Sequence, residues 1–285
     1  MDYRRAENLE DAVRLRREMG YAFVAGGTDI YPAIENGARF PGLIDVSKVE
    51  ALRGKIRREH DAWIIPALAT WSEVVAADLP PQFDALKQAA AEVGGRQIQN
   101  AGTVAGNICN ASPAADGIPA LMSLGAGIVI AGSSGEREVP LEEFVLGNRK
   151  TALQEGELLR AVKVPVRAAR CASAFRKLGA RRYLVISIVM VAATLECDAG
   201  GRITYAGISV GACAARALRL AAWEQALLGR SIADLHALEV APAYLAPLSP
   251  MDDIRGSGAY RVHAAGVLVR EALAKAAVRL NEQVS

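Results

Sequence analysis

Small and hydrogen-bonding side chains are concentrated between Arg96 and Asp116, in the sequence RQIQNAGTVAGNICNASPAAD. This segment has little apolar periodicity, so the pattern predicts a loop rather than an element that fills a core. Gly102 and Gly106 would let main-chain N–H groups approach a ligand, because glycine has no Cβ in the way. Consecutive N–H groups form a concave anion site, for which the polyanionic part of a nucleotide cofactor is the natural ligand.

A second glycine pair lies near the N-terminus, in the sequence YAFVAGGTDIYPAI. We expect a strand over Tyr21–Val24, a turn at Gly26 and Gly27, and a helix opened by Thr28 and Asp29. This order is similar to a phosphate cradle, in which the turn and the helix N-terminus direct N–H groups at an anion. Glycine turns before helices also occur in proteins that bind nothing. Two such segments in one chain favour a binding function for both.

The central segment allows two interpretations. In the structural one, Ser112 caps a helix that has Pro113 at its first position and Asp116 in its first turn. In the functional one, the backbone of Thr103–Asn107 and the Asn107 amide hold a phosphate or a flavin edge, and Asp116 accepts from a sugar hydroxyl. The two are compatible, because a capped helix end is a good place to hold a ligand.

The glycine pattern argues against a Rossmann dinucleotide site. Asp45 lies in a predicted strand, Leu43–Val46, about where the ribose-binding acid of such a site would be. However, the chain has a GG pair rather than GxGxxG, and Pro32 interrupts the following helix. We therefore interpret Asp45 as a structural residue.

Composition limits the function further. The net charge of +2, from 33 basic and 31 acidic residues, gives no argument for nucleic-acid binding. No apolar run reaches the length of a membrane span and no secretory signal is visible, so we expect a cytoplasmic protein. The cysteines show no CxxC spacing, so we expect buried thiols and no metal or iron–sulfur cluster held by this chain. They are Cys109, Cys171, Cys197 and Cys213.

Helices and strands must position the two glycine-rich segments. Further helices are expected over Leu9–Met19 (capped by Asn8), Trp71–Val75, Gln82–Val93, Ala215–Leu228 and Tyr260–Glu282. Further strands are expected over Trp63–Leu68, Gly127–Ala131, Glu138–Pro140 and Leu158–Pro165, with a β-hairpin formed by Val185–Cys197 and Arg202–Val210. The pattern changes around Pro165–Arg170, where we place a domain boundary.

The motifs VAGGTDI and TVAGNICNASPAAD, in this order, resemble the FAD-binding medium subunit of the molybdenum hydroxylases, the xanthine dehydrogenase and carbon monoxide dehydrogenase family. The segments SAFRKLGARR and PLSPMDDIRGSGAYR extend the resemblance over nearly the whole chain. It implies an α+β fold with an FAD-binding domain of the p-cresol methylhydroxylase/vanillyl-alcohol oxidase type, over residues 1–168. Two α+β subdomains, about 1–55 and 56–168, would be followed by a C-terminal domain, 169–285, of antiparallel sheet packed on helices.

The resemblance also implies cofactor-binding residues. Those of the first pyrophosphate loop are Ala25, Gly26, Gly27, Thr28, Asp29 and Ile30, and those of the second are Thr103, Gly106, Asn107, Ser112 and Asp116. Leu159 would contact the flavin, unless it is a core residue. Lys177 would lie near the flavin ring, unless it is a surface lysine. Some relatives cover the ring with an aromatic residue after the arginine pair; here Val185 and Ile186 are aliphatic, and we expect Ile186 to cover it.

The implied function is that of an FAD-carrying electron-transfer subunit with no catalytic acid or base. Electrons would come from [2Fe–2S] clusters on a small subunit, supplied by a molybdopterin-binding large subunit, and leave to NAD⁺, oxygen or another acceptor. A heterotrimer is implied, and NASPAAD favours xanthine or another N-heterocycle as the substrate of the complex. The alternatives are a self-contained FAD-dependent reductase on the same fold and a non-catalytic flavin-binding module.

Overall fold

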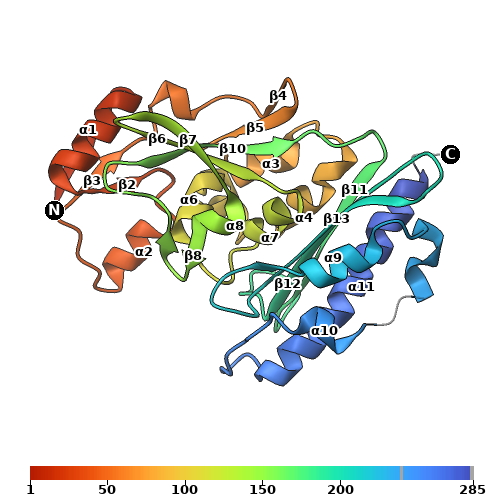
Figure 1. Cartoon of the computed structure of the whole chain (residues 1–285). Helices are drawn as coiled ribbons and strands as arrows, with labels where there is room; N and C mark the ends of the chain where they lie inside the picture. Colours follow the sequence, from red (N-terminus) through yellow and green to blue (C-terminus); the bar gives the residue numbers. More distant parts are fainter. Residues whose placement is uncertain (238–239, 283–285) are drawn as a thin grey trace.

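The structure, a computed structural model, describes residues 1–237 and 240–282 (Figure 1). The positions 238–239 and 283–285 of the expected C-terminal domain lie outside the described residues. An N-terminal sheet lies at one end of the molecule and the C-terminal helix at the other, with a larger sheet and short helices between them. Within the described ranges, no helix is both long and apolar enough to cross a bilayer.

The N-terminal unit is a small parallel sheet in the order β1-β3-β2, formed by Asp2–Arg5, Gly42–Asp45 and Ala22–Val24. Helix α1 (Leu9–Met19) connects β1 to β2, and α2 (Ile30–Glu35) precedes β3. The predicted cap of α1 is confirmed, because the Asn8 side chain accepts a hydrogen bond from the Asp11 N–H. The predicted helix end at Gly20 is also confirmed, since its φ of 64° is the left-handed cap conformation.

Asp45 is a structural residue, as the glycine pattern indicated. Its carboxylate, in β3, accepts hydrogen bonds from the Tyr3 hydroxyl (2.7 Å), the Arg5 guanidinium (3.1 Å) and the Ser47 N–H (2.8 Å). Burial raises the pKa of Asp45, but hydrogen bonds from Ser47, Tyr3 and Arg5 outweigh it and lower the pKa to about 2. The acid therefore connects the neighbouring strands β1 and β3.

We expect Asp45 to make the folded state acid-sensitive. Because its folded pKa is depressed, its contribution to the free energy of unfolding is present above about pH 4 and is lost as the pH falls towards 2. The contribution is at most about 2 kcal/mol. Urea unfolding of Asp45→Asn should show this loss at pH 7 and a smaller difference from wild type at pH 3. The exposed Asp61→Asn is the matched control; equal losses for the two variants would contradict this role.

The central sheet is antiparallel, in the order β4-β5-β10-β6-β7. Its strands are Arg57–Glu59, Ala62–Pro66, Leu158–Pro165, Gly127–Gly132 and Gly135–Pro140. Helices α3 (Trp71–Ala76) and α4 (Asp84–Glu92) lie beside it in the same core. The predicted start of α3 is confirmed by a capping box, in which Thr70 and Glu73 hydrogen-bond to each other's backbone N–H.

The loop predicted over Arg96–Asp116 is wrong, because this segment is largely helical. It forms α5 (Arg96–Ala101) and α6 (Val104–Asn110) before α7 (Gly117–Ser123). Thr103 caps α6 by accepting from the Gly106 N–H at 3.0 Å, and Val104 and Ile108 supply a buried face. The predicted helix start at Pro113 is also wrong, since Ser112–Ala115 is a turn and α7 begins only at Gly117.

The C-terminal sheet is antiparallel, in the order β11-β12-β13-β14. These strands are Cys171–Leu178, Val189–Cys197, Ile203–Gly211 and Leu218–Arg219. The predicted hairpin is confirmed by the pairing of β12 with β13. The single helix predicted over Ala215–Leu228 is wrong, because Leu218 and Arg219 pair with β13 and only α9 (Ala221–Leu227) is helical.

Helices cover both faces of the C-terminal sheet (Figure 1). Alternate residues of β12 separate into two cores: Met190 and Ala192 join the core that contains α4 and α7, whereas Val191 joins the core that contains α9 and α11 (Gly258–Glu282). The remaining elements are η1 (Glu50–Leu52), η2 (Pro81–Phe83), α8 (Leu141–Phe144), β8 (Val145–Gly147), β9 (Lys150–Thr151), η3 (Ile232–Ala237) and α10 (Pro242–Leu245). The predicted C-terminal arrangement of antiparallel sheet on helices is therefore confirmed.

Candidate functional site

The two glycine-rich segments are in direct contact. A Cβ on Gly26 would overlap the carbonyl oxygen of Ala101, at the end of α5, so only glycine fits there. The Asn110 side-chain amide donates to the Asp29 carboxylate at 3.1 Å and joins α6 to the first segment. Two segments that are far apart in the sequence therefore form one wall.

A cavity of about 890 Å³ lies along this wall. Most of the residues predicted from the resemblance line it: Ala25, Gly26, Gly27, Thr28, Asp29, Ile30, Thr103, Gly106, Asn107, Ser112 and Leu159. Leu159 is 4% exposed, so it is both a core residue and part of the lining. The size suits an organic cofactor, because ligand sites commonly enclose roughly 300–1,000 Å³.

The sequence interpretation missed several lining residues. Apolar walls come from Phe23, Trp71, Val93, Ile98 and Leu153, and a cationic side chain comes from Arg16 at the end of α1. The predicted helix over Trp71–Val75 indicated that Trp71 lies in a first helical turn. Nothing in the sequence placed Phe23 or Leu153 beside the glycine turns. These side chains give the cavity the mostly apolar lining with few polar groups that is typical of cofactor sites.

One polar atom of a cavity-lining residue lacks a protein partner among the described residues. The Asn107 Oδ1 atom is buried and accepts no hydrogen bond from any residue in the described part of the chain. A buried acceptor without a donor is costly in a folded protein, unless a ligand or water supplies the donor. The backbone N–H groups at the start of α6 already donate within the protein, since those of Gly106 and Asn107 donate to the Thr103 side chain and carbonyl. The lining therefore fits a ligand that carries a hydrogen-bond donor for Asn107, and anion binding falls to the glycine turn of residues 25–30.

Two ionisable side chains of the lining are perturbed. Partial burial raises the pKa of the Asp29 carboxyl, against an opposing Coulombic effect of Arg149. Burial raises the pKa of the Cys109 thiol to about 12, so this group is neutral at physiological pH. The described residues contain no cluster of acidic, histidine or cysteine side chains that could hold a metal ion.

Asp116 and Lys177 do not border the cavity. Lys177 Nζ lies 2.6 Å from Asp116 Oδ2, and the Ser187 hydroxyl donates to Asp116 Oδ1 at 2.6 Å. Both charged side chains are less than 10% exposed, so the alternative of Lys177 as a surface lysine is wrong. Burial raises the pKa of Asp116, and the neighbouring Lys177 opposes this rise. The pair connects α7 to β11; its contact with a flavin stays a prediction.

Ile186 is also absent from the lining. It is 62% exposed and lies in the segment between β11 and β12, together with Tyr183, which is equally exposed. Tyr183 directly follows Arg181 and Arg182, so an aromatic residue does occupy the position after the arginine pair. The sequence interpretation passed over it in favour of two aliphatic residues.

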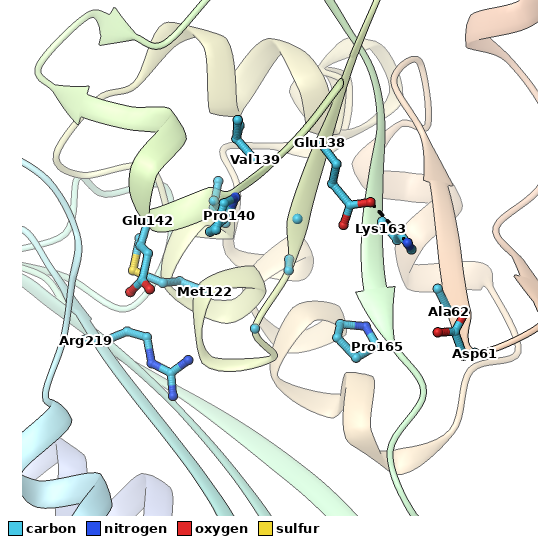
Figure 2. Close-up of a pocket in the computed structure, with 14 residues that line it drawn as sticks. Asp61, Ala62, Met122, Glu138, Val139, Pro140, Glu142, Lys163, Pro165 and Arg219 are labelled. Atoms are coloured by element: carbon cyan, nitrogen blue, oxygen red, sulfur yellow. Dashed lines mark hydrogen bonds and ion pairs between the residues drawn. The ribbon is translucent and has the colours of Figure 1, made fainter. Parts of the chain in front are cut away.

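A second cavity, of about 580 Å³, lies between the central sheet and the C-terminal sheet (Figure 2). Its lining includes Glu138, Lys163 and Arg219, and none of the predicted cofactor residues. Lys163 pairs with Glu138 at 3.1 Å, and Arg219 is held by both carboxylate oxygens of Glu224. Because its cations are already neutralised, this cavity is a poor site for a pyrophosphate.

Comparison with known proteins agrees with this geometry. Residues 1–167 match the family described as the FAD binding domain in molybdopterin dehydrogenase, and residues 173–276 match the CO dehydrogenase flavoprotein C-terminal domain. The chain is 31% identical to the carbon monoxide dehydrogenase medium chain of Afipia carboxidovorans, over 98% of this chain and 97% of that protein. It is 33% identical to the nicotinate dehydrogenase FAD-subunit of Eubacterium barkeri, over 78% of each.

The fold is also that of a solved relative. A structure of reconstituted CO dehydrogenase from Oligotropha carboxidovorans superposes with a TM-score of 0.89 at 29% identity and covers 98% of both chains. The agreement covers both the glycine-rich wall and the C-terminal sheet, so the motifs and the architecture lead to the same conclusion. The chain belongs to the FAD-binding medium subunits of the molybdenum hydroxylases, a family of oxidoreductases.

Proposed function

We propose that FAD binds in the larger cavity, with its pyrophosphate against the wall formed by residues 25–30 and 103–107. The single observation that carries this proposal is the meeting of the two glycine-rich segments along one cavity. Backbone N–H groups of the first segment, residues 25–30, would neutralise the phosphate charge, and the Asn107 carboxamide would gain the partner that its Oδ1 atom lacks. Ser112 and Leu159 would fix the sugar and ring portions.

The bound flavin would supply the redox chemistry, because it can accept electrons one or two at a time. The protein would bind it, orient it and exclude water through Trp71 and Leu159, which are both nearly inaccessible to solvent. Asp116 directly follows Ala115, which lines the cavity, so its pair with Lys177 would place charges near the cofactor. No acid or base from this chain is required for electron transfer.

We further propose the assembly that such a subunit needs. A small subunit with [2Fe–2S] clusters would deliver electrons, a molybdopterin-binding large subunit would oxidise the substrate, and NAD⁺ or oxygen would accept the electrons. The second-loop sequence NASPAAD supports an N-heterocyclic substrate, and the complex would be a cytoplasmic heterotrimer. The domain division would be 1–168, with subdomains near 1–55 and 56–168, and 169–285. The five-residue connection between β10 and β11 supports this boundary, since those strands belong to different sheets.

Titration with FAD tests the site. Replacing Asn107 with Ala should weaken FAD binding about tenfold, which corresponds to one lost buried hydrogen bond of about 1.4 kcal/mol. Flavin fluorescence quenching measures the affinity, and the absorption spectrum before and after heat release gives the stoichiometry. Asn36→Ala, at the exposed residue that directly follows α2, is the matched control. Equal affinities for wild type and Asn107→Ala would argue against this placement of the cofactor.

A further inference from the structure

Arg261 is a buried cation that does not border the larger cavity. It lies in the first turn of α11 and is 3% exposed, although arginine is rarely buried in folded proteins. Its Nη2 atom lies 2.6 Å from the Asp253 carboxylate, and its Nη1 atom donates to two backbone carbonyls. Its buried Nε atom has no hydrogen-bond partner in the described part of the chain. A buried donor without an acceptor is costly, so this placement needs a compensating contact.

The pairing with Asp253 does not explain the burial of Arg261. The Asp253 side chain is 32% exposed, and it already accepts two hydrogen bonds from the Arg255 guanidinium, of 2.7 and 3.1 Å. Hydrogen bonds from Arg255 are the largest cause of the lowered pKa of Asp253, ahead of the bond from Arg261. A long arginine side chain could meet such a partly exposed carboxylate in solvent. The buried position of Arg261 therefore serves its two carbonyl partners.

The two carbonyls lie at the same end of the paired strands β12 and β13. Arg261 Nη1 donates to the Ile188 oxygen at 2.7 Å, directly before β12, and to the Ala212 oxygen at 3.1 Å, directly after β13. Ala212 has a φ of +61°, which is unfavourable for a residue with a Cβ and persists only where the surroundings hold it. The hydrogen bond from Arg261 is one of the contacts that hold it.

The same two segments contact the second glycine-rich segment. The Ala212 N–H donates to the Pro113 carbonyl at 2.9 Å. Ser187, which directly precedes Ile188, donates to the Asp116 carboxylate at 2.6 Å. Pro113 and Asp116 belong to the turn of residues 112–116. Three residues of this turn line the larger cavity: Ser112, Ala114 and Ala115. One guanidinium is thus linked by two short paths to a turn that borders the cavity.

We propose that Arg261 is a positioning residue for the cofactor, which fixes the turn of residues 112–116 against the larger cavity by holding the Ile188 and Ala212 carbonyls. The inference rests on the proposed function, because it concerns the cavity in which we place FAD. Arginine suits this role better than lysine, since its rigid planar fork reaches Asp253 and the two carbonyls with different nitrogen atoms. Asp253 would orient the guanidinium, so the loop before α11 would affect a cavity that it does not border.

The test uses the full chain and two variants, each with a matched control. Arg261→Lys keeps the charge and loses the fork, and its control Leu273→Ala truncates a buried side chain farther along α11. Asp253→Asn removes the counter-charge, and its control Asp252→Asn changes the neighbouring carboxylate, which accepts from the Gly258 N–H. FAD titration measures the affinity, and circular dichroism of the bound flavin reports its surroundings. Amide exchange of the FAD-free chain is followed in peptides that cover residues 112–116.

We expect Arg261→Lys to weaken FAD binding about tenfold, the equivalent of about one buried hydrogen bond. The circular dichroism of the bound flavin should change, and residues 112–116 should exchange faster, because the turn is held less firmly. Asp253→Asn should change all three readouts in the same direction. Leu273→Ala should lower the melting temperature and leave the FAD affinity and the flavin spectrum unchanged, and Asp252→Asn should resemble wild type.

Wild-type FAD affinity and flavin spectrum in Arg261→Lys would overturn the proposal. The same holds if Leu273→Ala changes both readouts as much as Arg261→Lys does, since Arg261 would then contribute only to stability. If Arg261→Lys does not fold, the two carboxylate variants decide, and equal FAD affinities for Asp253→Asn and Asp252→Asn would overturn the proposal. A wild-type chain that binds no FAD would instead refute the proposed function.

Discussion

Gly26→Ala is expected to abolish FAD binding at micromolar cofactor concentrations. The added methyl group would overlap the carbonyl oxygen of Ala101, a backbone atom that cannot move aside as a flexible side chain could. Separating the two segments would open the wall against which we place the pyrophosphate. Overpacking of this kind commonly costs about 1–3 kcal/mol in stability, and a clash with the backbone belongs at the upper end.

The effect can be measured by FAD titration together with thermal unfolding. Gly147→Ala, in β8, is the matched control, because an added Cβ there meets no atom within 4 Å and the backbone is not left-handed. The control should bind FAD like wild type. If Gly26→Ala retained full FAD affinity while remaining folded, the contact between the two segments would be irrelevant to the cofactor.

Lys177→Met is expected to destabilise the fold by about 3–5 kcal/mol, the usual cost of leaving a buried charge without its partner. Asp116 is 9% exposed on its side chain and would keep only the Ser187 hydroxyl as a partner. The double variant Lys177→Met/Asp116→Asn should recover much of the loss, because no isolated charge then remains. Chemical denaturation in urea measures both free energies.

The exposed pair between Lys163 and Glu138 provides the comparison for this prediction. Lys163→Met removes a cation that is 37% exposed, and such surface pairs contribute about 0–1 kcal/mol. If Lys177→Met were as stable as Lys163→Met, the buried pair would not connect α7 to β11 as described.

Much of the fold was predictable because local signals agreed with the tertiary structure. The Asn8 cap, the Thr70 capping box and the apolar run of β12 each specify an element without knowledge of its neighbours. The first glycine turn was predictable for the same reason, since a strand, two glycines and a helix follow one another directly. The resemblance supplied most of the second segment of the cavity wall.

The remaining features depend on contacts between distant residues. Helices α5 and α6 were missed because glycine and asparagine have low helix propensity, and burial of Val104 and Ile108 overrides it. The ion pair between Asp116 and Lys177 joins residues 61 positions apart, and no periodic pattern reports such a partner. Phe23 and Leu153 reach the cavity only through the tertiary arrangement of their strands and turns.

The most direct test of the central claim is amide hydrogen exchange of the chain with and without FAD. We predict slower exchange in peptides that cover residues 25–30 and 103–112 when FAD is bound, because both segments would hold the cofactor. Peptides that cover residues 138–142, beside the second cavity, should not change. Protection confined to residues 138–142, or no protection in either glycine-rich segment at saturating FAD, would contradict the account.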